Sequence, residues 1–124
     1  MFAVLATVSP SGAPQSSVIW VKRDGNAVLF STIRGRLKTR YMEQNPRVSL
    51  CLYDPDDPYA YVEIRGEVSI TEQGGDALID ELSRVYDCKP WTIRLHETRV
   101  VCRVTPTKVI EHVAAQSPHA RAKS

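Results

Sequence analysis

Long apolar runs, paired cysteines and a secretory leader are all missing from this sequence of 124 residues. No run approaches the roughly 20 apolar residues that a membrane-spanning helix needs, so we expect no membrane segment. The apolar start at Met1–Val8 has no basic region ahead of it, which excludes a signal peptide. Three cysteines without a C-x-x-C pair argue against a disulfide framework and favour a reducing, cytoplasmic location.

Familiar catalytic signatures are missing as well. The three histidines show no metal-ligand spacing with each other or with the cysteines, so we expect no metal site. Neither a G-x-S-x-G nucleophile elbow nor a Walker loop is present, which removes α/β-hydrolases and P-loop NTPases. We assign no catalytic side chain, and the sequence favours a cofactor that carries the chemistry.

Charge is balanced over the whole chain but uneven along it. The net charge is only +2, so the protein as a whole is not a binder of polyanions. Residues 22–47 hold seven cations against two acids, a local net of +5, which leaves −3 for the remainder. The excess positive charge of the protein is therefore concentrated in residues 22–47.

The residue pattern predicts a mainly β (α+β) fold, a small antiparallel barrel of six to seven strands with two helices. Asp24-Gly25 predicts a hairpin with a type I′ turn, and Gly66 predicts a bulge or a close approach of two backbones. We expect one domain over residues 1–113 and a flexible tail over 114–124. Strands are expected over 2–8, 15–23, 27–31, 47–53, 59–70 and 99–104 (extended by 108–113), and helices over 36–44 and 76–86.

The most informative segment is the turn where the third strand leads into the first helix. Arg34, Arg36, Lys38 and Arg40 crowd a helix start, where the macrodipole already disfavours cations. An anion in the turn would remove this conflict, and backbone N–H groups, guanidinium forks and the hydroxyls of Ser31 and Thr32 suit a phosphate. The alternative is a solvated basic turn without a ligand.

Two tyrosines mark a second candidate surface. Tyr59 and Tyr61 alternate along one strand and therefore share a face. That face suits either stacking on a planar ligand or packing against a partner subunit.

Five runs stand together in order and spacing: FAVLATV (2–8), SGAPQSSVIW (11–20), GRLKTR (35–40), NPRVSL (45–50) and YAYVEIRG (59–66). With these runs the chain resembles the pyridoxamine 5′-phosphate oxidase-like superfamily over residues 2 to about 112. Within it, the chain is most similar to the small flavin/deazaflavin oxidoreductases of the B group, which use coenzyme F420. Members usually have a helix before the first strand, whereas here the strand is expected from the start, as in a shorter form or an incomplete N-terminus.

The resemblance implies a split β-barrel homodimer with two cofactor sites at the subunit interface. Arg36 and Lys38, helped by Ser31, Thr32 and Arg40, would hold the cofactor phosphate. The implied residues around the tricyclic ring are Gln15, Ser17 and Val18, partly through backbone groups, and Tyr59 and Tyr61 of the other subunit.

Three classes of function follow. The first is an oxidoreductase in which reduced F420 delivers a hydride to a small electron-poor substrate, with FMN as the alternative cofactor; the acidic tail of F420 suits the positive segment. The second is a carrier or sensor that binds flavin, deazaflavin or haem without turnover. The third, nucleic-acid binding, would need aromatic residues interleaved with the cations, and only Tyr41 lies beside them, so we expect no nucleic-acid partner.

Overall fold

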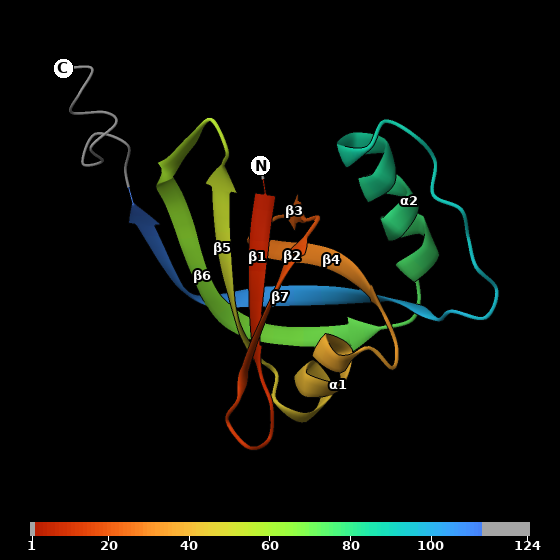
Figure 1. The fold of residues 1–124 in the computed structure, drawn as a ribbon, viewed down its shortest axis with the longest axis horizontal. Coiled ribbons are helices and arrows are strands. Elements are labelled where there is room, and N and C mark those ends of the chain that lie inside the picture. Colours follow the sequence, from red (N-terminus) through yellow and green to blue (C-terminus); the bar gives the residue numbers. More distant parts are fainter. Residues whose placement is uncertain (1, 113–124) are drawn as a thin grey trace.

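The computed structural model describes residues 2–112, which form one seven-stranded sheet and two helices (Figure 1). All strand pairs are antiparallel, in the order β2-β1-β5-β6-β7-β4-β3, which confirms the predicted fold class. The predicted tail lies outside the described residues. The elements are β1 (Phe2–Val8), β2 (Pro14–Ile19), β3 (Lys22–Asp24), β4 (Ala27–Ile33), α1 (Leu37–Gln44), β5 (Arg47–Asp54), β6 (Asp57–Thr71), α2 (Gly75–Tyr86) and β7 (Arg99–His112).

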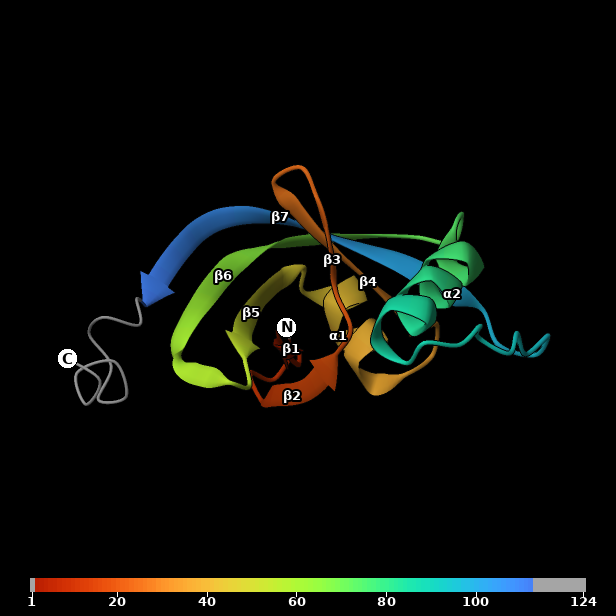
Figure 2. The ribbon, with the colours of Figure 1, turned by 90° about the horizontal axis from the view of Figure 1, so that it is seen from above.

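The sheet curls round on itself, as the view from above in Figure 2 shows, and buried side chains form the core inside it. Side chains alternate between the two faces of a strand, so Ala3 and Leu5 of β1 are buried while Val4 and Ala6 are only half-buried on the outer face. Met42 of α1 joins the same core, so this helix packs against the barrel interior and completes it at the lower end in Figure 1. The strands contribute most of the core, including Leu5, Phe30, Leu50, Val100, Cys102 and Val104, all fully buried.

The single strand predicted over residues 15–23 is wrong. β2 ends at Ile19 and β3 begins at Lys22, and these two strands lie at opposite ends of the sheet order. Between them, the backbone N–H of Val21 donates to the Tyr86 hydroxyl at 3.3 Å, and that hydroxyl donates to the Val21 carbonyl at 3.0 Å. A side chain of α2 thus takes the place of a strand partner where the chain crosses between the sheet ends.

The hairpin predicted at Asp24-Gly25 is present, but its turn is not type I′. Asp24 pairs with Ala27, so the two loop residues are Gly25 and Asn26. Within the described chain, Gly25 has a φ of +61° and Asn26 is not among the residues with positive φ. A type I′ turn needs positive φ at both loop positions.

Gly66 lies at a close approach of β6 to β7, as predicted. The strand register shifts between Arg65 and Gly66, and a Cβ atom at Gly66 would collide with the Thr105 carbonyl oxygen. Pro106 lies opposite this irregularity, where a missing N–H is tolerated. For this reason β7 runs unbroken from Arg99 to His112, which confirms the predicted extension of this strand beyond Pro106.

The helix predicted over residues 76–86 is confirmed as α2, which packs against β4 and β7 through Leu78, Ile79 and Leu82. Neither helix of the described chain is long and apolar enough to cross a membrane.

Candidate functional site

The turn from β4 into α1 presents the start of a helix without a cap. Gly35 has a φ of +96°, a conformation that favours glycine, and the Arg36 N–H donates to the Ile33 carbonyl at 3.2 Å. Arg36 is the N-cap residue, its side chain makes no capping hydrogen bond, and the first turn of α1 contains no acid. The backbone N–H groups inside the first turn of α1, which follow Arg36, and the positive end of the helix dipole are therefore available to an anion.

Two threonines fix the first turn of α1 to the end of β4. The Thr39 hydroxyl donates to the Ile33 carbonyl at 2.8 Å and lies 3.3 Å from the Thr32 hydroxyl oxygen. Both side chains are buried. Thr32 is predicted to contact the phosphate, but its buried hydroxyl contacts Thr39 and so helps to hold the turn in place. Ser31 is half-buried, and its hydroxyl lies 3.5 Å from the Gly75 carbonyl of α2.

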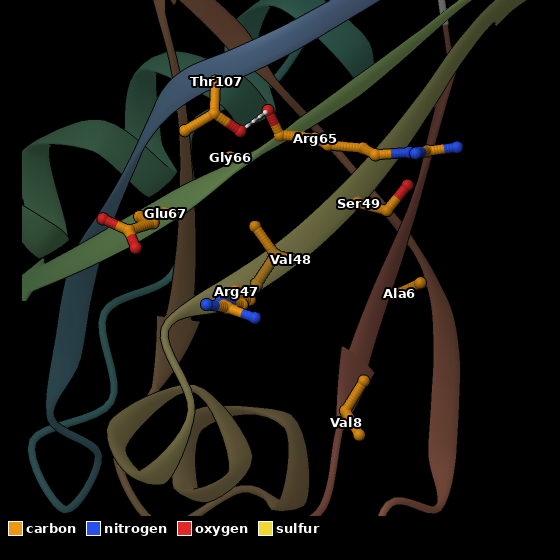
Figure 3. Close-up of a pocket in the computed structure, with 9 residues that line it drawn as sticks. All are labelled: Ala6, Val8, Arg47, Val48, Ser49, Arg65, Gly66, Glu67 and Thr107. Atoms are coloured by element: carbon orange, nitrogen blue, oxygen red, sulfur yellow. Dashed lines mark hydrogen bonds between the residues drawn. The ribbon is translucent and has the colours of Figure 1, made fainter.

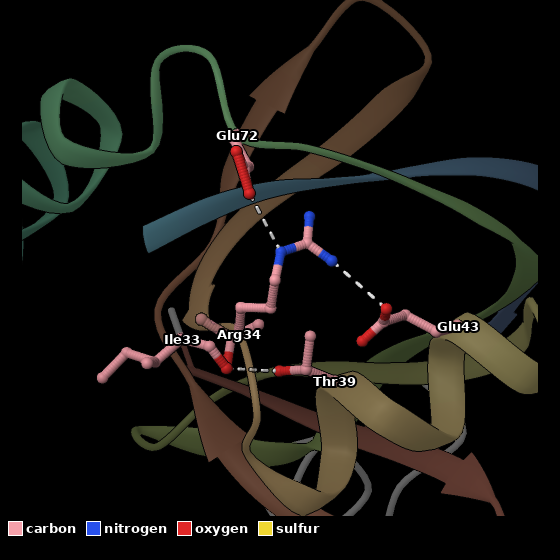
Figure 4. A network of polar contacts seen from close by, with 6 residues as sticks. Ile33, Arg34, Thr39, Glu43 and Glu72 are labelled. Atoms are coloured by element: carbon pink, nitrogen blue, oxygen red, sulfur yellow. Dashed lines mark hydrogen bonds and ion pairs between the residues drawn. The ribbon is translucent and has the colours of Figure 1, made fainter. Parts of the chain in front are cut away.

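Arg34 is held by two carboxylates and clamps the turn between neighbouring elements (Figure 4). Its guanidinium lies 3.2 Å from Glu43 of α1 and 3.2 Å from Glu72, and its backbone N–H donates to the Thr98 carbonyl at 2.9 Å. Because its charge is already paired with two carboxylates, Arg34 holds the turn in place and is less available to a ligand than an unpaired cation.

Arg36 and Lys38 remain without a carboxylate partner among the described residues. Lys38 is half-buried, and its ammonium donates to the Ser17 hydroxyl of β2 at 3.2 Å. Burial lowers the pKa of Lys38, and the positive charges of Arg36 and Arg99 lower it further. Arg40 is exposed and lies roughly 200° around the helix axis from Lys38, so the helix points these two side chains in different directions.

Arg99, at the start of β7, joins this group of cations, although no local sequence pattern marks it as a site residue. It lies next to Ile33 in the sheet register and close enough to Lys38 and Arg36 to affect the pKa of Lys38 and to be affected by Arg36. More than 60 residues separate Arg99 from Arg36 in the chain, so only the β4–β7 pairing brings them together.

The ring residues predicted on β2 divide between its two faces. Gln15 and Ser17 are half-buried on the inner side, where the Gln15 amide oxygen accepts a hydrogen bond from Thr7 at 3.1 Å. Val18 points outward and is 65% exposed. Because β2 is an edge strand that pairs only with β1 in the described chain, its outer backbone groups can also reach a ligand.

Tyr59 and Tyr61 lie away from this group of cations within one chain. Figures 1 and 2 both place the β5–β6 hairpin on the far side of the barrel from α1. Tyr59 is 51% exposed, and Tyr61 stacks on His112 with 4.1 Å between ring centroids. A single subunit therefore does not bring the tyrosines to Arg36 and Lys38.

A hollow of about 500 Å³ lies on the outer face of the sheet, across β1, β5, β6 and β7 (Figure 3). Ala6 and Val8 form its apolar side, while Arg47, Arg65 and Glu67 bring charges of both signs. In the described residues no three histidine, cysteine or acidic side chains gather in a way that could hold a metal ion.

Comparisons with known proteins agree with this architecture. A solved structure called an F420 reductase is 35% identical, with 89% of each chain covered and a TM-score of 0.79. A pyridoxamine 5′-phosphate oxidase-related, FMN-binding protein from Nostoc punctiforme is 19% identical, with 87% of this chain and 71% of that chain covered and a TM-score of 0.68. General Stress Protein 26 from Bacillus anthracis is 23% identical, with 90% and 83% covered and a TM-score of 0.66. The last two likenesses show the fold alone.

None of the curated proteins matches the sequence. The family model described as pyridoxamine 5′-phosphate oxidase matches residues 1–113, almost the whole chain. With an antiparallel barrel, two helices and an uncapped basic turn at the start of α1, the chain belongs to the pyridoxamine 5′-phosphate oxidase-like family of split barrels.

Proposed function

We propose that this protein is an oxidoreductase that binds F420 and passes a hydride from its reduced form to a small electron-poor organic substrate. The observation that carries the proposal is the uncapped start of α1, where Arg36 and Lys38 have no carboxylate partner in the described chain. The 35% identity to an F420 reductase supports the choice of cofactor.

The residues at this turn suit a phosphate group. Arg36 and Lys38 would bind the phosphate by charge-assisted hydrogen bonds, together with free N–H groups at the helix start, Ser31 nearby, and Arg40 further along the helix. Thr32 would act through Thr39, which fixes the turn. Gln15, Ser17 and the outer edge of β2 would orient the ring system, with Val18 contributing through its backbone. When bound, F420 supplies the hydride; the protein supplies position and a dry surface.

FMN is the second candidate, because it also combines a phosphate with a tricyclic ring. The likeness to an FMN-binding split barrel fits either cofactor, since at 19% identity it shows the fold alone. The excess of positive charge over residues 22–47 favours F420, which carries an acidic tail besides its phosphate. The three cysteines are free, which fits a cytoplasmic location, and nucleic acid is not among the proposed partners.

We further propose that two copies associate through the outer face of the sheet and that Tyr59 and Tyr61 of one copy reach the site of the other. Val4, Ala6 and Val8 form an apolar strip on the outer face of β1, and Ala6 and Val8 also line the hollow in Figure 3. An apolar patch bordered by charges of both signs suits a two-fold interface, in which the same patch meets itself.

Light scattering should report the mass of a dimer. Ala6→Arg places a long cation on the strip and should give a monomer with weakened cofactor binding, because each site would lose its partner tyrosines. Val85→Arg, at a 70% exposed position of α2, is the matched control and should remain a dimer. A monomer that binds the cofactor with full affinity would contradict an interface site.

A turnover assay distinguishes an enzyme from a carrier that binds the cofactor without catalysis. Protein loaded with reduced F420 is mixed without oxygen with nitroaromatics, quinones and enones, and the absorbance of oxidised F420 is followed. The proposal predicts that oxidised F420 appears in proportion to reduced acceptor. Tight binding with no reoxidation beyond the protein-free rate, whichever acceptor is used, would instead support a non-catalytic carrier.

A further inference from the structure

Arg99 carries a polar atom that the fold leaves unsatisfied. The Nε of its guanidinium is buried and has no hydrogen-bond partner among the described residues. Buried donors in folded proteins are nearly always paired, so this donor is available to a group that the fold itself does not supply, such as a water molecule or a bound ligand. Because Arg99 is at the start of β7 beside the end of β4, this donor lies at the same end of β4 as the phosphate turn.

The guanidinium of Arg99 is held in place by its surroundings. It lies over the ring of Trp91, 4.9 Å from the ring centroid, in the geometry of a cation–π contact. The backbone of Trp91 donates to the Asp80 carboxylate at 2.9 Å, and its ring packs edge-on against Trp20 with 6.2 Å between centroids. Gly75 of α2 packs directly against the Arg99 carbonyl, which fixes the backbone as well. A ligand would therefore meet a prearranged group.

The charges around Arg99 do not neutralise it. Burial lowers the pKa of Arg99, and Arg36 is the next cause; Arg94 lowers it slightly and the carboxylates of Glu97 and Asp76 raise it. Neither carboxylate forms an ion pair with Arg99 in the described chain. An arginine keeps its proton at any working pH, so the positive charge persists and repels Arg36 and Lys38.

We propose that Arg99 is a third phosphate-binding residue, which joins Arg36 and Lys38 across the β4–β7 pairing. A phosphoryl group suits this position because it accepts the planar, forked hydrogen bonds of a guanidinium and relieves the repulsion among three cations. The inference rests on the proposed cofactor site but concerns only its phosphate end. It applies to a phosphate diester, as in F420, and to a monoester, as in FMN.

The test uses inorganic phosphate as the probe, with chloride at matched ionic strength as the reference. Thermal unfolding and tryptophan fluorescence are recorded for the full chain, for Arg99→Gln and for Lys108→Gln, which removes one charge from an exposed position on the same strand. Phosphate should stabilise the wild type and Lys108→Gln. In Arg99→Gln, we expect at least a tenfold weaker phosphate affinity and an unfolding midpoint without phosphate that is no lower than that of the wild type.

Fluorescence supplies a readout that a purely structural role would not give. Because Arg99 lies over Trp91, phosphate should change the fluorescence of the wild type, and Trp91→Phe should remove most of that change. If Arg99→Gln does not fold, Arg99→Lys keeps the charge but loses the forked donor, and its affinity should fall at least threefold. Unchanged phosphate affinity in the folded variant, or no response of the wild type at millimolar phosphate, would overturn the inference. Titration of the wild type with F420 is separate, so weak F420 binding with an Arg99-dependent phosphate response would refute only the proposed cofactor.

Discussion

Arg36→Ala combined with Lys38→Ala is expected to weaken F420 binding by about 3–4 kcal/mol, on the order of several hundred-fold in Kd. Each hydrogen bond between a charged donor and a phosphate contributes about 1.5–3 kcal/mol, and the partly screened site favours the lower half of that range. Both side chains lie at the uncapped start of α1, and neither has a carboxylate that would take over its charge. The measurement is a fluorescence titration of the purified variant.

The matched control removes the same charges elsewhere. Arg23→Ala combined with Lys108→Ala deletes one arginine and one lysine from exposed positions on β3 and β7, and it should bind F420 almost as the wild type does. The double variant at α1 should be no less stable than the wild type without cofactor, since burial and like charges already lower the pKa of Lys38. Equal losses of affinity in the two double variants would mean that only net charge matters, which contradicts a phosphate site at the turn.

Phe30→Ala should reduce the free energy of unfolding by about 3–5 kcal/mol, the cost of removing a large aromatic side chain from a close-packed core. Phe30 is the largest fully buried side chain of the described chain, and it comes from β4, the strand that leads into the turn before α1. Urea unfolding at a fixed protomer concentration measures the effect, because dimer formation would otherwise shift the midpoint.

Val109→Ala serves as the comparison for this core substitution. Val109 lies on β7 and is 54% exposed, so its truncation should change stability by no more than about 0.5 kcal/mol. A loss of less than about 1 kcal/mol for Phe30→Ala would contradict a close-packed interior at the end of β4 that supports the site.

Local patterns were sufficient for much of this fold. The strands, the amphipathic α2 and the Gly66 irregularity follow from alternation, helical spacing and the position of glycine, which act within a few residues. The break between β2 and β3 does not, because it depends on the Tyr86 hydroxyl, which bonds to Val21 from 65 residues away. The predicted type I′ turn at Asp24-Gly25 is wrong because the pairing register of β3 and β4 decides which two residues form the loop, and the Asp-Gly pair alone does not reveal that register.

The residues of the candidate site likewise fall into those that local sequence predicts and those that depend on contacts between distant parts of the chain. Arg36 and Lys38 stand out in the sequence because cations at a helix start conflict with the dipole there, and this conflict is local. Arg99 does not stand out, since its role depends on the pairing of β4 with β7 and on the ring of Trp91. The separation of Gln15 and Ser17 from Val18 follows from strand alternation. The position of the β5–β6 hairpin, which carries Tyr59, on the side of the barrel away from α1 depends on the whole fold and could not be predicted locally.

The most direct test of the account is a side-by-side titration of the cofactor-free protein with F420 and with FMN, followed by the fluorescence of Trp20 and Trp91. Both rings belong to the aromatic group on which Arg99 rests, so they report on the site itself. The account predicts saturation at two F420 molecules per dimer, with clearly weaker FMN binding. A preference for FMN would move the protein to the flavin branch of its family, and binding of neither would contradict a cofactor site at the start of α1.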